Sequence, residues 1–437
     1  MNKVFKPRVK GLILSILMAF CGLVRAQLTI EITGGHEAAI PIAIVPFSGA
    51  RPVNDPASEV DRVVIADLER SGRFRAFPEK DMISKPSRRA DVDYRTWEAL
   101  GQDYLVIGHT RRVRVDRYEI VFYLIDVFKH QQISEYSIPM SPNNLRRVAH
   151  KISDLIYEKI IGQPGAFSSQ IAYVTDTIKA DNSREFKLQV ADADGFNPQT
   201  ILTSREPIMS PTWSPDGNRL AYVSFEKKSS AVYIQTVATG SRYPVASYPG
   251  INGAPAWSSD GKQLALTLSK DGNPDIYILD LNSGSLHRLT NNFSIDTEAV
   301  WTPDGQHILF TSDRGGTPQI YQIRLIDKQV QRLTFDGNYN AGASISPDGM
   351  SVAIVHGSGG QRYRIAILDM SSGNMTELTD GGMDESPSFA PNGSMVLYAT
   401  RHGGREQLSA VSVDGNFSQQ LLSREGGVRE PAWSPVN

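Results

Sequence analysis

The stretch Pro211-Thr-Trp213-Ser-Pro-Asp-Gly217 recurs along the second half of the chain. Its aromatic or apolar position returns every 44 residues, at Trp213, Trp257, Trp301, Ile345, Phe389 and Trp433. The last copy, Pro431-Ala-Trp433-Ser-Pro435, stops before its turn is complete. A fixed period of this length indicates a repeat architecture, in which each period forms one structural unit.

Each period has the composition of four short strands. The Ser-Pro-Asp-Gly segment places Pro, Asp and Gly where a type I turn prefers them. Strand-like runs follow, such as 220–224 and 275–280, and a fourth run ends in Leu-Thr, as at Leu289-Thr290. Four strands in about 40–50 residues are typical of a β-propeller blade. A β-sandwich or barrel is the alternative, but neither requires a strict period.

The two ends of the repeat region set the number of blades. Residues 171–175, 188–192 and 201–204 read as the second, third and fourth strands of a unit without a first strand. The terminal copy at 431–435 supplies only a first strand. Joined together they make a sixth blade, which removes free sheet edges. We therefore predict an α+β protein of two domains, with a six-bladed propeller at 169–437.

Residues 1–26 have the pattern of a cleaved secretory signal peptide. Four basic residues precede an apolar run at 11–24, and Val24-Arg-Ala26 offers a small residue on which cleavage can occur. The run is shorter than the roughly 20 residues that a membrane anchor needs. Cys21, the only cysteine, follows the bulky Phe20, which disfavours lipoprotein processing. We expect cleavage after Ala26.

Removal of this segment changes the charge of the chain. The segment contains five basic and no acidic residues, so the mature chain carries 40 basic against 47 acidic residues, a net charge of −7. An acidic chain is not expected to bind nucleic acid or an anionic membrane surface. No second apolar span follows, so we expect no membrane insertion.

Residues 27–39 read as a flexible peptide. Leu28, Ile30 and Ile32 alternate with Thr29, Glu31 and Thr33, which is the pattern of a half-buried strand, and Gly34-Gly35 follows. Such a peptide can add a strand to the sheet of a partner. The pattern is equally compatible with an ordinary edge strand of the segment's own domain.

Residues 40–162 are predicted to form a small α/β domain. We expect a buried strand at 40–47, a helix from Asp55-Pro56 to Gly72, a short helix at 95–100 and a strand at 104–108. Runs 118–128 and 133–138 should form a hairpin. Ser141-Pro142 should cap a long helix that ends at Gly162, and 163–168 is the predicted linker.

Motifs for catalysis are missing from the sequence. It contains no Gly-x-Ser-x-Gly elbow, no His-Glu-x-x-His and no phosphate-binding Gly-x-x-x-x-Gly-Lys motif. We therefore predict no catalytic residue, no metal ligand and no cofactor. Carboxylates do recur before the first strands, where they would surround one mouth of the propeller channel. They could bind a metal ion, face basic groups of a partner, or form a solvated rim: Glu206, Asp296, Glu298, Asp384, Glu385 and Glu430.

With this order of segments the chain resembles the TolB family of the Tol–Pal system. The resemblance is carried by the repeat and by Arg205-Glu-Pro-Ile-Met-Ser-Pro211, Asn252-Gly-Ala-Pro255, Gln319-Ile-Tyr321 and Pro431-Ala-Trp433-Ser-Pro435. It implies a monomeric, non-enzymatic periplasmic adaptor that supports outer-membrane integrity and constriction during cell division. It also implies that the propeller mouth binds the lipoprotein Pal and is used by some bacteriocins, and that the N-terminal peptide binds the C-terminal domain of TolA.

The resemblance also implies site residues. The TolA segment would be Leu28, Thr29, Ile30, Glu31, Ile32 and Thr33. The Pal surface would comprise Met209, Ser210, Ile251, Asn252, Gly253, Ala254, Thr297 and Glu298, with Asn340, Glu385 and Arg429 added by equivalence between blades. Ile251 departs from the histidine that family members often carry there, which would alter any pH dependence of binding. A propeller hydrolase or lactonase and a periplasmic glycan-binding module are the alternative functions.

Overall fold

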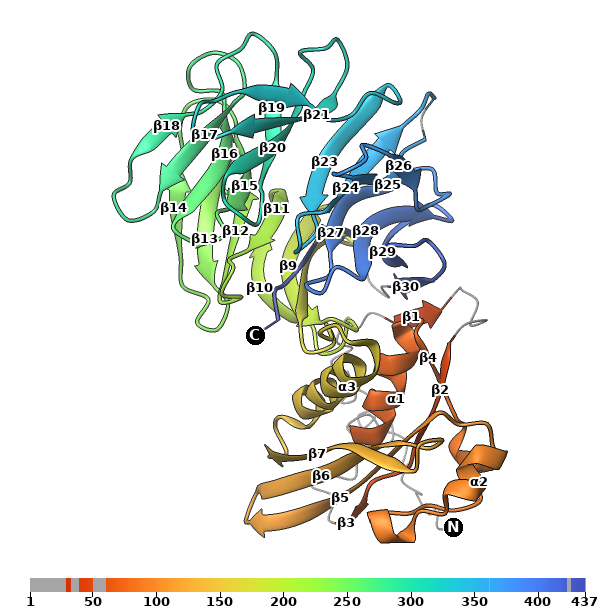
Figure 1. Ribbon diagram of the computed structural model, residues 1–437. Helices are drawn as coiled ribbons and strands as arrows, with labels where there is room; N and C mark the ends of the chain where they lie inside the picture. Colours follow the sequence, from red (N-terminus) through yellow and green to blue (C-terminus); the bar gives the residue numbers. More distant parts are fainter. Residues whose placement is uncertain (1–28, 33–38, 50–59, 361, 423–425, 437) are drawn as a thin grey trace, which may run out of the picture.

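The computed structural model describes residues 29–32, 39–49, 60–360, 362–422 and 426–436. It contains a small α/β domain and a β-propeller, joined through the end of helix α3 (Figure 1). The predicted signal peptide and the predicted start of the first helix at Asp55-Pro56 lie outside the described residues. None of the helices in the described ranges has the length and apolar character that crossing a bilayer requires.

The sheet of the α/β domain mixes parallel and antiparallel strands. Its order is β4-β2-β5-β6-β7, and the short strand β3 pairs with β5. Strand β2 runs parallel to β4 and β5, whereas β5, β6 and β7 form an antiparallel meander. The bounds are β2 Ile40–Ile44, β3 Ser48–Gly49, β4 Phe74–Ala76, β5 Tyr104–Arg114, β6 Arg117–Asp126 and β7 Gln131–Met140.

Helices cover both faces of this sheet. Alternate residues of β2 point to opposite sides, so Ile42 and Ile44 pack under helices α1 (Val60–Arg70) and α3 (Leu145–Ile161). Ala43 faces the other side, where Trp97 of helix α2 (Tyr94–Ala99) is fully buried. Two 3-10 turns, η2 (Glu79–Asp81) and η3 (Arg89–Asp91), connect β4 to α2. The predicted hairpin and short helix are confirmed.

Two predictions for this domain need correction. The long helix does not begin after a Ser141-Pro142 cap: its N-cap residue is Asn144, whose side-chain oxygen instead accepts the Ser141 amide proton at 2.7 Å. Strand β5 does not end at 108 but continues to Arg114, because it pairs with β6 along its whole length. The basic run at 111–114 lies on this exposed extension, as expected of a solvated strand face.

The propeller has six blades of four propeller strands each, and one blade carries the additional strand β1 (Thr29–Ile32) at its edge. Five of them are continuous in sequence and begin at β11, β15, β19, β23 and β27. Their strands are β11 Ile208–Trp213, β12 Arg219–Ser224, β13 Ala231–Thr236, β14 Arg242–Ala246; β15 Asn252–Trp257, β16 Gln263–Leu268, β17 Asp275–Asp280, β18 Leu286–Arg288; β19 Asp296–Trp301, β20 His307–Ser312, β21 Gln319–Arg324, β22 Val330–Arg332; β23 Tyr339–Ile345, β24 Ser351–Gly357, β25 Arg364–Asp369, β26 Met375–Glu377; and β27 Glu385–Phe389, β28 Met395–His402, β29 Arg405–Ser412, β30 Ser418–Leu422.

The sixth blade is assembled from both ends of the domain, as the sequence predicts. Strand β31 (Gly427–Trp433) pairs antiparallel with β8 (Gln170–Ile178), and β9 (Arg184–Asp192) and β10 (Gln199–Ser204) complete the sheet. The Ser434 Oγ hydroxyl accepts the Gln170 amide proton at 2.8 Å, which fastens the C-terminal strand beside the start of β8. The ring is therefore closed by contacts between residues far apart in the sequence.

Hydrogen bonds from the repeated tryptophan link neighbouring blades. The indole Nε1 of Trp257 donates to the Thr212 carbonyl oxygen at 3.2 Å, and that of Trp301 donates to the Ala256 carbonyl oxygen at 3.2 Å. Trp213 makes the same bond, at 3.1 Å, to Ala432 of the sixth blade. Each bond contributes about 1 kcal/mol. At three of the six repeat positions, the indole N–H therefore ties its blade to the first strand of the preceding blade.

Candidate partner-binding site

A ring of β-bulges lines the central channel, one in the first strand of each blade. The register of each first strand shifts by one residue against its second strand at the same place in the repeat. The bulged residue has a positive φ angle in every blade. These residues recur every 44 positions: Ser210 (50°), Ala254 (42°), Glu298 (55°), Gly342 (63°), Ser386 (54°) and Glu430 (53°).

Five of these six residues are not glycine, so the ring carries backbone strain. The left-handed region costs a residue with a Cβ atom about 1–2 kcal/mol. Such strain is retained where a fold needs a side chain or an amide to point in an unusual direction, often at functional sites. Ser210, Ala254 and Glu298, which the resemblance assigns to the partner surface, all belong to this ring.

Two glutamates of the ring connect one blade to the next. The Oε2 atom of Glu298 accepts hydrogen bonds from the Thr311 hydroxyl at 2.8 Å and from the Gly342 amide at 2.9 Å. Glu430 Oε2 accepts the Ser210 amide proton at 3.2 Å. These carboxylates therefore hold the ring together, in addition to lending it negative charge.

Two glutamates at the channel have raised pKa values. Burial raises the pKa of Glu430, and the nearby Glu385 and Glu298 raise it further, against the opposing effect of the Ser210 amide and Arg429. Burial and the charge of Glu406 raise the pKa of Glu385 as well, while Arg429 opposes this. Protonation of these groups is thus easier than in water.

A buried polar residue stands near the start of four first strands, again at a spacing of 44: Asn252, Asp296, Asn340 and Asp384, each at most 1% exposed. Asn252 bonds to the backbone of Tyr248 through both its oxygen, at 2.8 Å, and its nitrogen, at 2.7 Å. Asn340 bonds to Gln319 at 2.9 Å and to the Asp336 carbonyl at 2.7 Å.

These contacts bear on two residues assigned to the partner surface. Asn252 and Asn340 have no exposed side-chain area with which to touch a partner. They instead fix the loops that lead into β15 and β23. Asp296 is held by both oxygens to the Arg314 guanidinium, at 2.9 and 2.8 Å, and Asp384 by Thr379 and Thr400. The mouth carboxylates are thus largely engaged within the protein.

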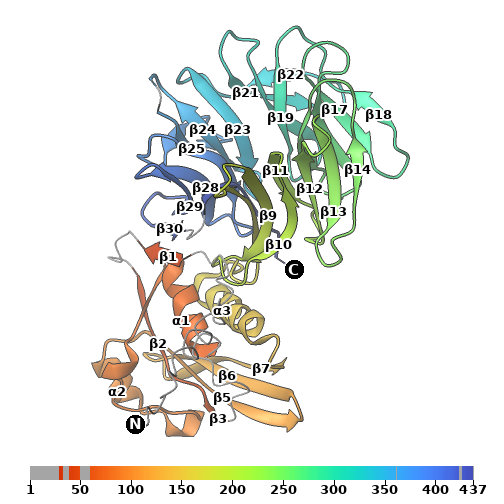
Figure 2. The same ribbon diagram turned by 180° about the vertical axis from the view of Figure 1, so that it is seen from behind.

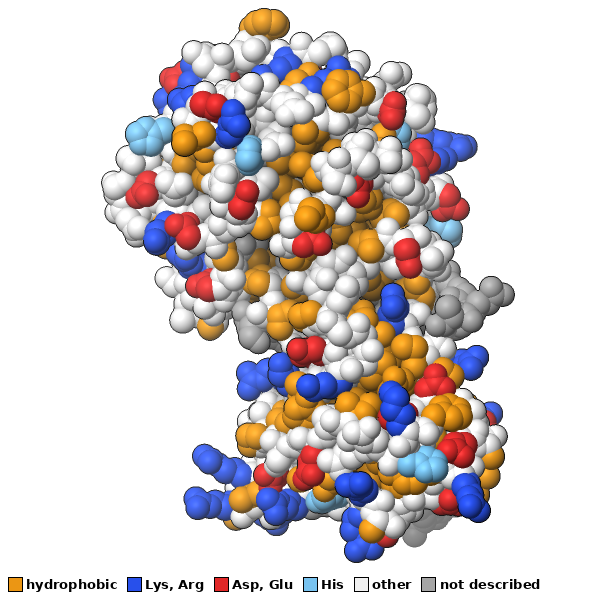
Figure 3. All heavy atoms as spheres, in the orientation of Figure 1, with side chains coloured by type: hydrophobic (Ala, Val, Ile, Leu, Met, Phe, Trp, Pro, Cys, Tyr) orange, Lys and Arg blue, Asp and Glu red, His pale blue; other side chains and the backbone are white. Residues whose placement is uncertain are grey.

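Apolar side chains are exposed immediately before these buried residues. Ile251, Ile295 and Met383 stand at equivalent positions and are 49%, 48% and 46% exposed. Phe293, in the loop before β19, and Phe335, in the loop before β23, are 92% and 72% exposed. We call these five residues the apolar rim. Figure 3 shows apolar side chains at the surface of the propeller face that is turned to the viewer.

Of the rim, sequence reasoning named only Ile251. Ile295 and Met383 could have been found from the 44-residue spacing, but Phe293 and Phe335 lie in loops that differ from blade to blade. Among the other assigned residues, Met209 is 41% exposed, and Gly253 and Thr297 are partly exposed.

Arg429 lies in a groove beside the mouth. Its guanidinium pairs with Asp176 of β8 at 2.5 Å and with Glu406 of β29 at 3.4 Å. The groove has a volume of about 410 Å³ and is also lined by Arg184, Arg401 and Arg405. The basic groove borders a channel that is rich in carboxylates.

The N-terminal segment forms a strand of the propeller. Residues Thr29–Ile32 (β1) pair antiparallel with β30, so that Thr29 faces Leu422 and Ile32 faces Gln419. This makes β1 the fifth strand of the blade that contains β27 to β30 (Figures 1 and 2). The sequence left open a strand added to a partner or an edge strand of the segment's own domain. The structure has an edge strand, but it belongs to a propeller blade. Leu28 and Thr33 lie outside the described residues.

Comparisons with known proteins agree with this architecture. Residues 28–133 match the family described as TolB amino-terminal domain, and residues 157–437 match TolB beta propeller domain. A crystal structure of TolB from Acinetobacter baumannii superposes with a TM-score of 0.87 at 44% sequence identity, covering 94% of this chain and 100% of that one.

Curated relatives carry the same description. The Tol-Pal system protein TolB of Nitrosococcus oceani is 52% identical over 231 residues, and that of Methylococcus capsulatus is 51% identical over 239 residues. These matches cover only about half of each relative, 52% and 55% of its length, and the same shares of this chain.

Proposed function

Because the chain belongs to the TolB family, we propose that it is a non-enzymatic periplasmic adaptor of the Tol–Pal system. It binds the lipoprotein Pal at the propeller mouth and the C-terminal domain of TolA through residues 28–33, and in this way supports outer-membrane integrity and constriction during division. Residues 1–26 are the signal peptide, and the division of the mature chain into 27–39, 40–162, 163–168 and 169–437 is part of the proposal.

The observation that supports the Pal site best is the apolar rim. Monomeric proteins seldom expose several large apolar side chains together unless a partner covers them. Here Phe293 and Ile295 precede β19 and Phe335 precedes β23 of the next blade, the two first strands that carry the bulged residues Glu298 and Gly342. A partner that inserts between them buries apolar area against a rigid base, which is the arrangement of a binding hot spot.

The proposed Pal surface combines direct and indirect contributors. Met209, Ser210, Ile251, Gly253, Ala254, Thr297, Glu298, Glu385 and Arg429 offer exposed or partly exposed area. Asn252 and Asn340 act through the loops that they hold. Engagement of Glu298, Glu430, Asp296 and Asp384 in internal hydrogen bonds favours an adaptor over a hydrolase or lactonase, which would need carboxylates free for substrate.

The proposed TolA segment is engaged as β1 on β30 in this structure. β1 is the outermost described strand of its blade, so β30 occupies one of its two edges. A partner that pairs with this same edge must first release the segment, because one strand edge cannot pair with two neighbours. The blade that loses β1 also carries Met383 and Glu385 at the mouth. Removal of residues 27–33 is therefore expected to change the affinity for Pal, and unchanged affinity would exclude such coupling.

The Pal site is tested with purified soluble Pal and fluorescence anisotropy. Ala254→Arg with Thr297→Arg places two long cations in the mouth and should weaken binding at least 100-fold. Gln306→Arg with Met350→Arg is the matched control, because both residues are exposed in the turns that follow the first strands. Equal affinity of both double variants would refute the mouth as the site, and absence of Pal binding by the unmodified chain would refute the adaptor function.

A further inference from the structure

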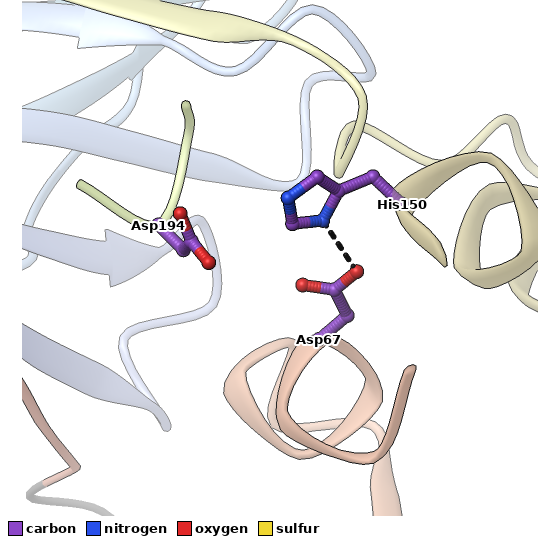
Figure 4. A group of neighbouring side chains, drawn as sticks. All are labelled: Asp67, His150 and Asp194. Carbon is purple, nitrogen blue, oxygen red and sulfur yellow. Dashed lines mark hydrogen bonds and ion pairs between the residues drawn. The ribbon is translucent and has the colours of Figure 1, made fainter. Parts of the chain in front are cut away.

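Six charged or ionisable residues meet where the α/β domain touches the propeller. Helix α1 provides Asp67 and Arg70, and helix α3 provides Arg146 and His150. The end of β9 and the turn after it provide Asp192 and Asp194. We call these six residues the junction cluster. Figure 4 shows Asp67 and Asp194 on different sides of the His150 ring.

Within the α/β domain, Asp67 contacts both of the other cluster residues that lie near it, Arg70 and His150. It is 1% exposed, and its Oδ2 atom lies 2.7 Å from His150 Nδ1 and 2.7 Å from the Ser153 hydroxyl. Its other oxygen pairs with Arg70 at 3.0 Å. Asp67 therefore fixes the His150 ring and keeps the proton on Nδ1.

Across the domain boundary, Arg146 and His150 face two propeller carboxylates. Arg146 pairs with Asp194, lies 3.8 Å from Asp192, and stacks on the Phe196 ring at 3.9 Å. His150 is 2% exposed, and its Nε2 atom lies 4.0 Å from Asp192 Oδ2 without forming a hydrogen bond to any described residue. A buried nitrogen thus points at the other domain with its hydrogen-bonding capacity unused.

The charges of the cluster leave one negative charge uncompensated when His150 is neutral. Three carboxylates, Asp67, Asp192 and Asp194, face the guanidinium groups of Arg70 and Arg146. A largely buried charge without a partner destabilises the contact that encloses it. A proton on His150 supplies the third positive charge and gives Nε2 a hydrogen to donate to Asp192.

We propose that His150 is a proton-operated latch between the two domains. When the imidazole is protonated, it bridges Asp67 of α1 and Asp192 of β9 and holds the propeller against the helices. When the imidazole is neutral, the excess negative charge loosens this contact, and the domains gain freedom to move relative to each other.

The titration behaviour supports this assignment. Burial and the charge of Arg70 lower the pKa of His150. The negative charges of Asp67 and Asp194 raise it, and their effect is larger, so the pKa of the imidazole is raised. Burial raises the pKa of Asp192, and His150 opposes this. A histidine whose pKa is raised in the docked state stabilises that state fully below its ordinary pKa of about 6.5. The stabilisation is lost as the pH rises through the raised value.

A divalent metal ion fits the same residues less well. The carboxylates of Asp67 and Asp194 are already paired with arginines, and two added positive charges would overshoot the single charge that is missing. A metal ion would also have to displace Arg146 from its stacked position on Phe196.

The latch is tested by measuring the distance between the domains as a function of pH. Spin labels are placed at Val115, in the α/β domain, and Ala238, in the turn after β13, of the full chain carrying Cys21→Ser; both sites are exposed. Distances between the two labels are measured by pulsed electron paramagnetic resonance between pH 5.5 and 8.5. The distance distribution should have one narrow peak at low pH and a second, broader peak at high pH. Because one proton is exchanged, the ratio of the two should change by at most about tenfold per pH unit.

Two variants should remove the transition in opposite directions. His150→Gln keeps a polar side chain without the charge and should show the broad population at every pH. Asp192→Asn balances the charges without a proton and should show the narrow population at every pH. His130→Gln is the control, because His130 pairs with Glu98 inside the α/β domain at 2.5 Å and should leave the transition intact.

Three results would overturn the proposal. The first is a distance distribution of the unmodified chain that does not change with pH. The second is a transition that persists in both His150→Gln and Asp192→Asn. The third is a transition that disappears when a chelator is added, since a metal ion rather than a proton would then hold the cluster.

Discussion

Glu298 of one blade accepts a hydrogen bond from the main-chain amide of Gly342 in the next blade, over 2.9 Å. Both residues occupy the bulged position of their first strand, with φ angles of 55° and 63°. The strained backbone turns the Gly342 amide toward the carboxylate, which satisfies a donor that the interrupted ladder leaves without its usual partner. The strain and the contact between blades thus depend on one another.

Glu298→Ala is therefore expected to destabilise the propeller by about 1–3 kcal/mol, because the amide of Gly342 and the hydroxyl of Thr311 lose their shared acceptor. Thermal unfolding measures the change. Glu385→Ala is the comparison, since Glu385 is exposed one position earlier in its own blade. An equal loss in both variants would contradict the role of the Glu298 contacts.

Trp257→Phe should cost at least about 1–2 kcal/mol, because the smaller phenyl ring fills only part of the site and leaves the Thr212 carbonyl without its donor. Trp97→Phe is the matched control. Trp97 is fully buried in the α/β domain, and its indole nitrogen has no hydrogen-bond partner among the described residues. Chemical denaturation of both variants should show a larger loss for Trp257, and a larger loss for Trp97 would count against the link between blades.

Gly72→Ala should destabilise the protein more than Gly101→Ala. Both glycines have a φ angle of 69°, so alanine costs each about 1 kcal/mol in backbone strain. A Cβ atom on Gly72 would also lie 2.5 Å from the ring of Phe417 in the propeller, whereas nothing lies within 4 Å of one on Gly101. Overpacking of this kind adds about 1–3 kcal/mol. Denaturation midpoints of the two variants compare the costs, and similar values would mean that the domains separate easily at this point.

Glu430→Gln should become more stable relative to the unmodified chain as the pH rises from 4 to 7. The pKa of Glu430 is raised in the folded state, so ionisation costs more there than in the unfolded chain. Its contribution to stability is therefore favourable at low pH and is lost as the pH rises through the folded value. Unfolding at several pH values gives the difference, and a constant difference would show that Glu430 titrates as it does in water.

The sequence predicted the architecture well because the repeat is strict. A spacing of 44 residues fixed the first strands, and the missing strand at one end matched the extra strand at the other, which gave six blades and their closure. The ring of bulges could not be predicted from the sequence, because Ser, Ala and Glu, the residue types at positions 210, 254 and 298, have no general preference for positive φ angles.

Other features depend on contacts between distant segments. The alternation at 28–33 predicts a strand but not its neighbour, and β30 as that neighbour follows only from how the domains pack. His150 lies on helix α3, whose apolar residues predict only that one face of the helix is buried. The local sequence pattern therefore does not indicate the junction cluster. Ser141 read as a helix cap because its type is favoured there, although Asn144 stands closer to the first helical turn.

The sixth blade has a consequence for the timing of folding. Trp433, within the last strand, bonds to Ser169 near the first, across 264 positions of the chain. A growing chain therefore cannot complete its ring until β31 has been synthesised, and until then β8 and the first-strand site beside it stay open to other strands. Pairing of β31 with β8 ends this exposure, so a chain interrupted before Gly427 would contain every other described strand of the propeller and yet be prone to aggregate.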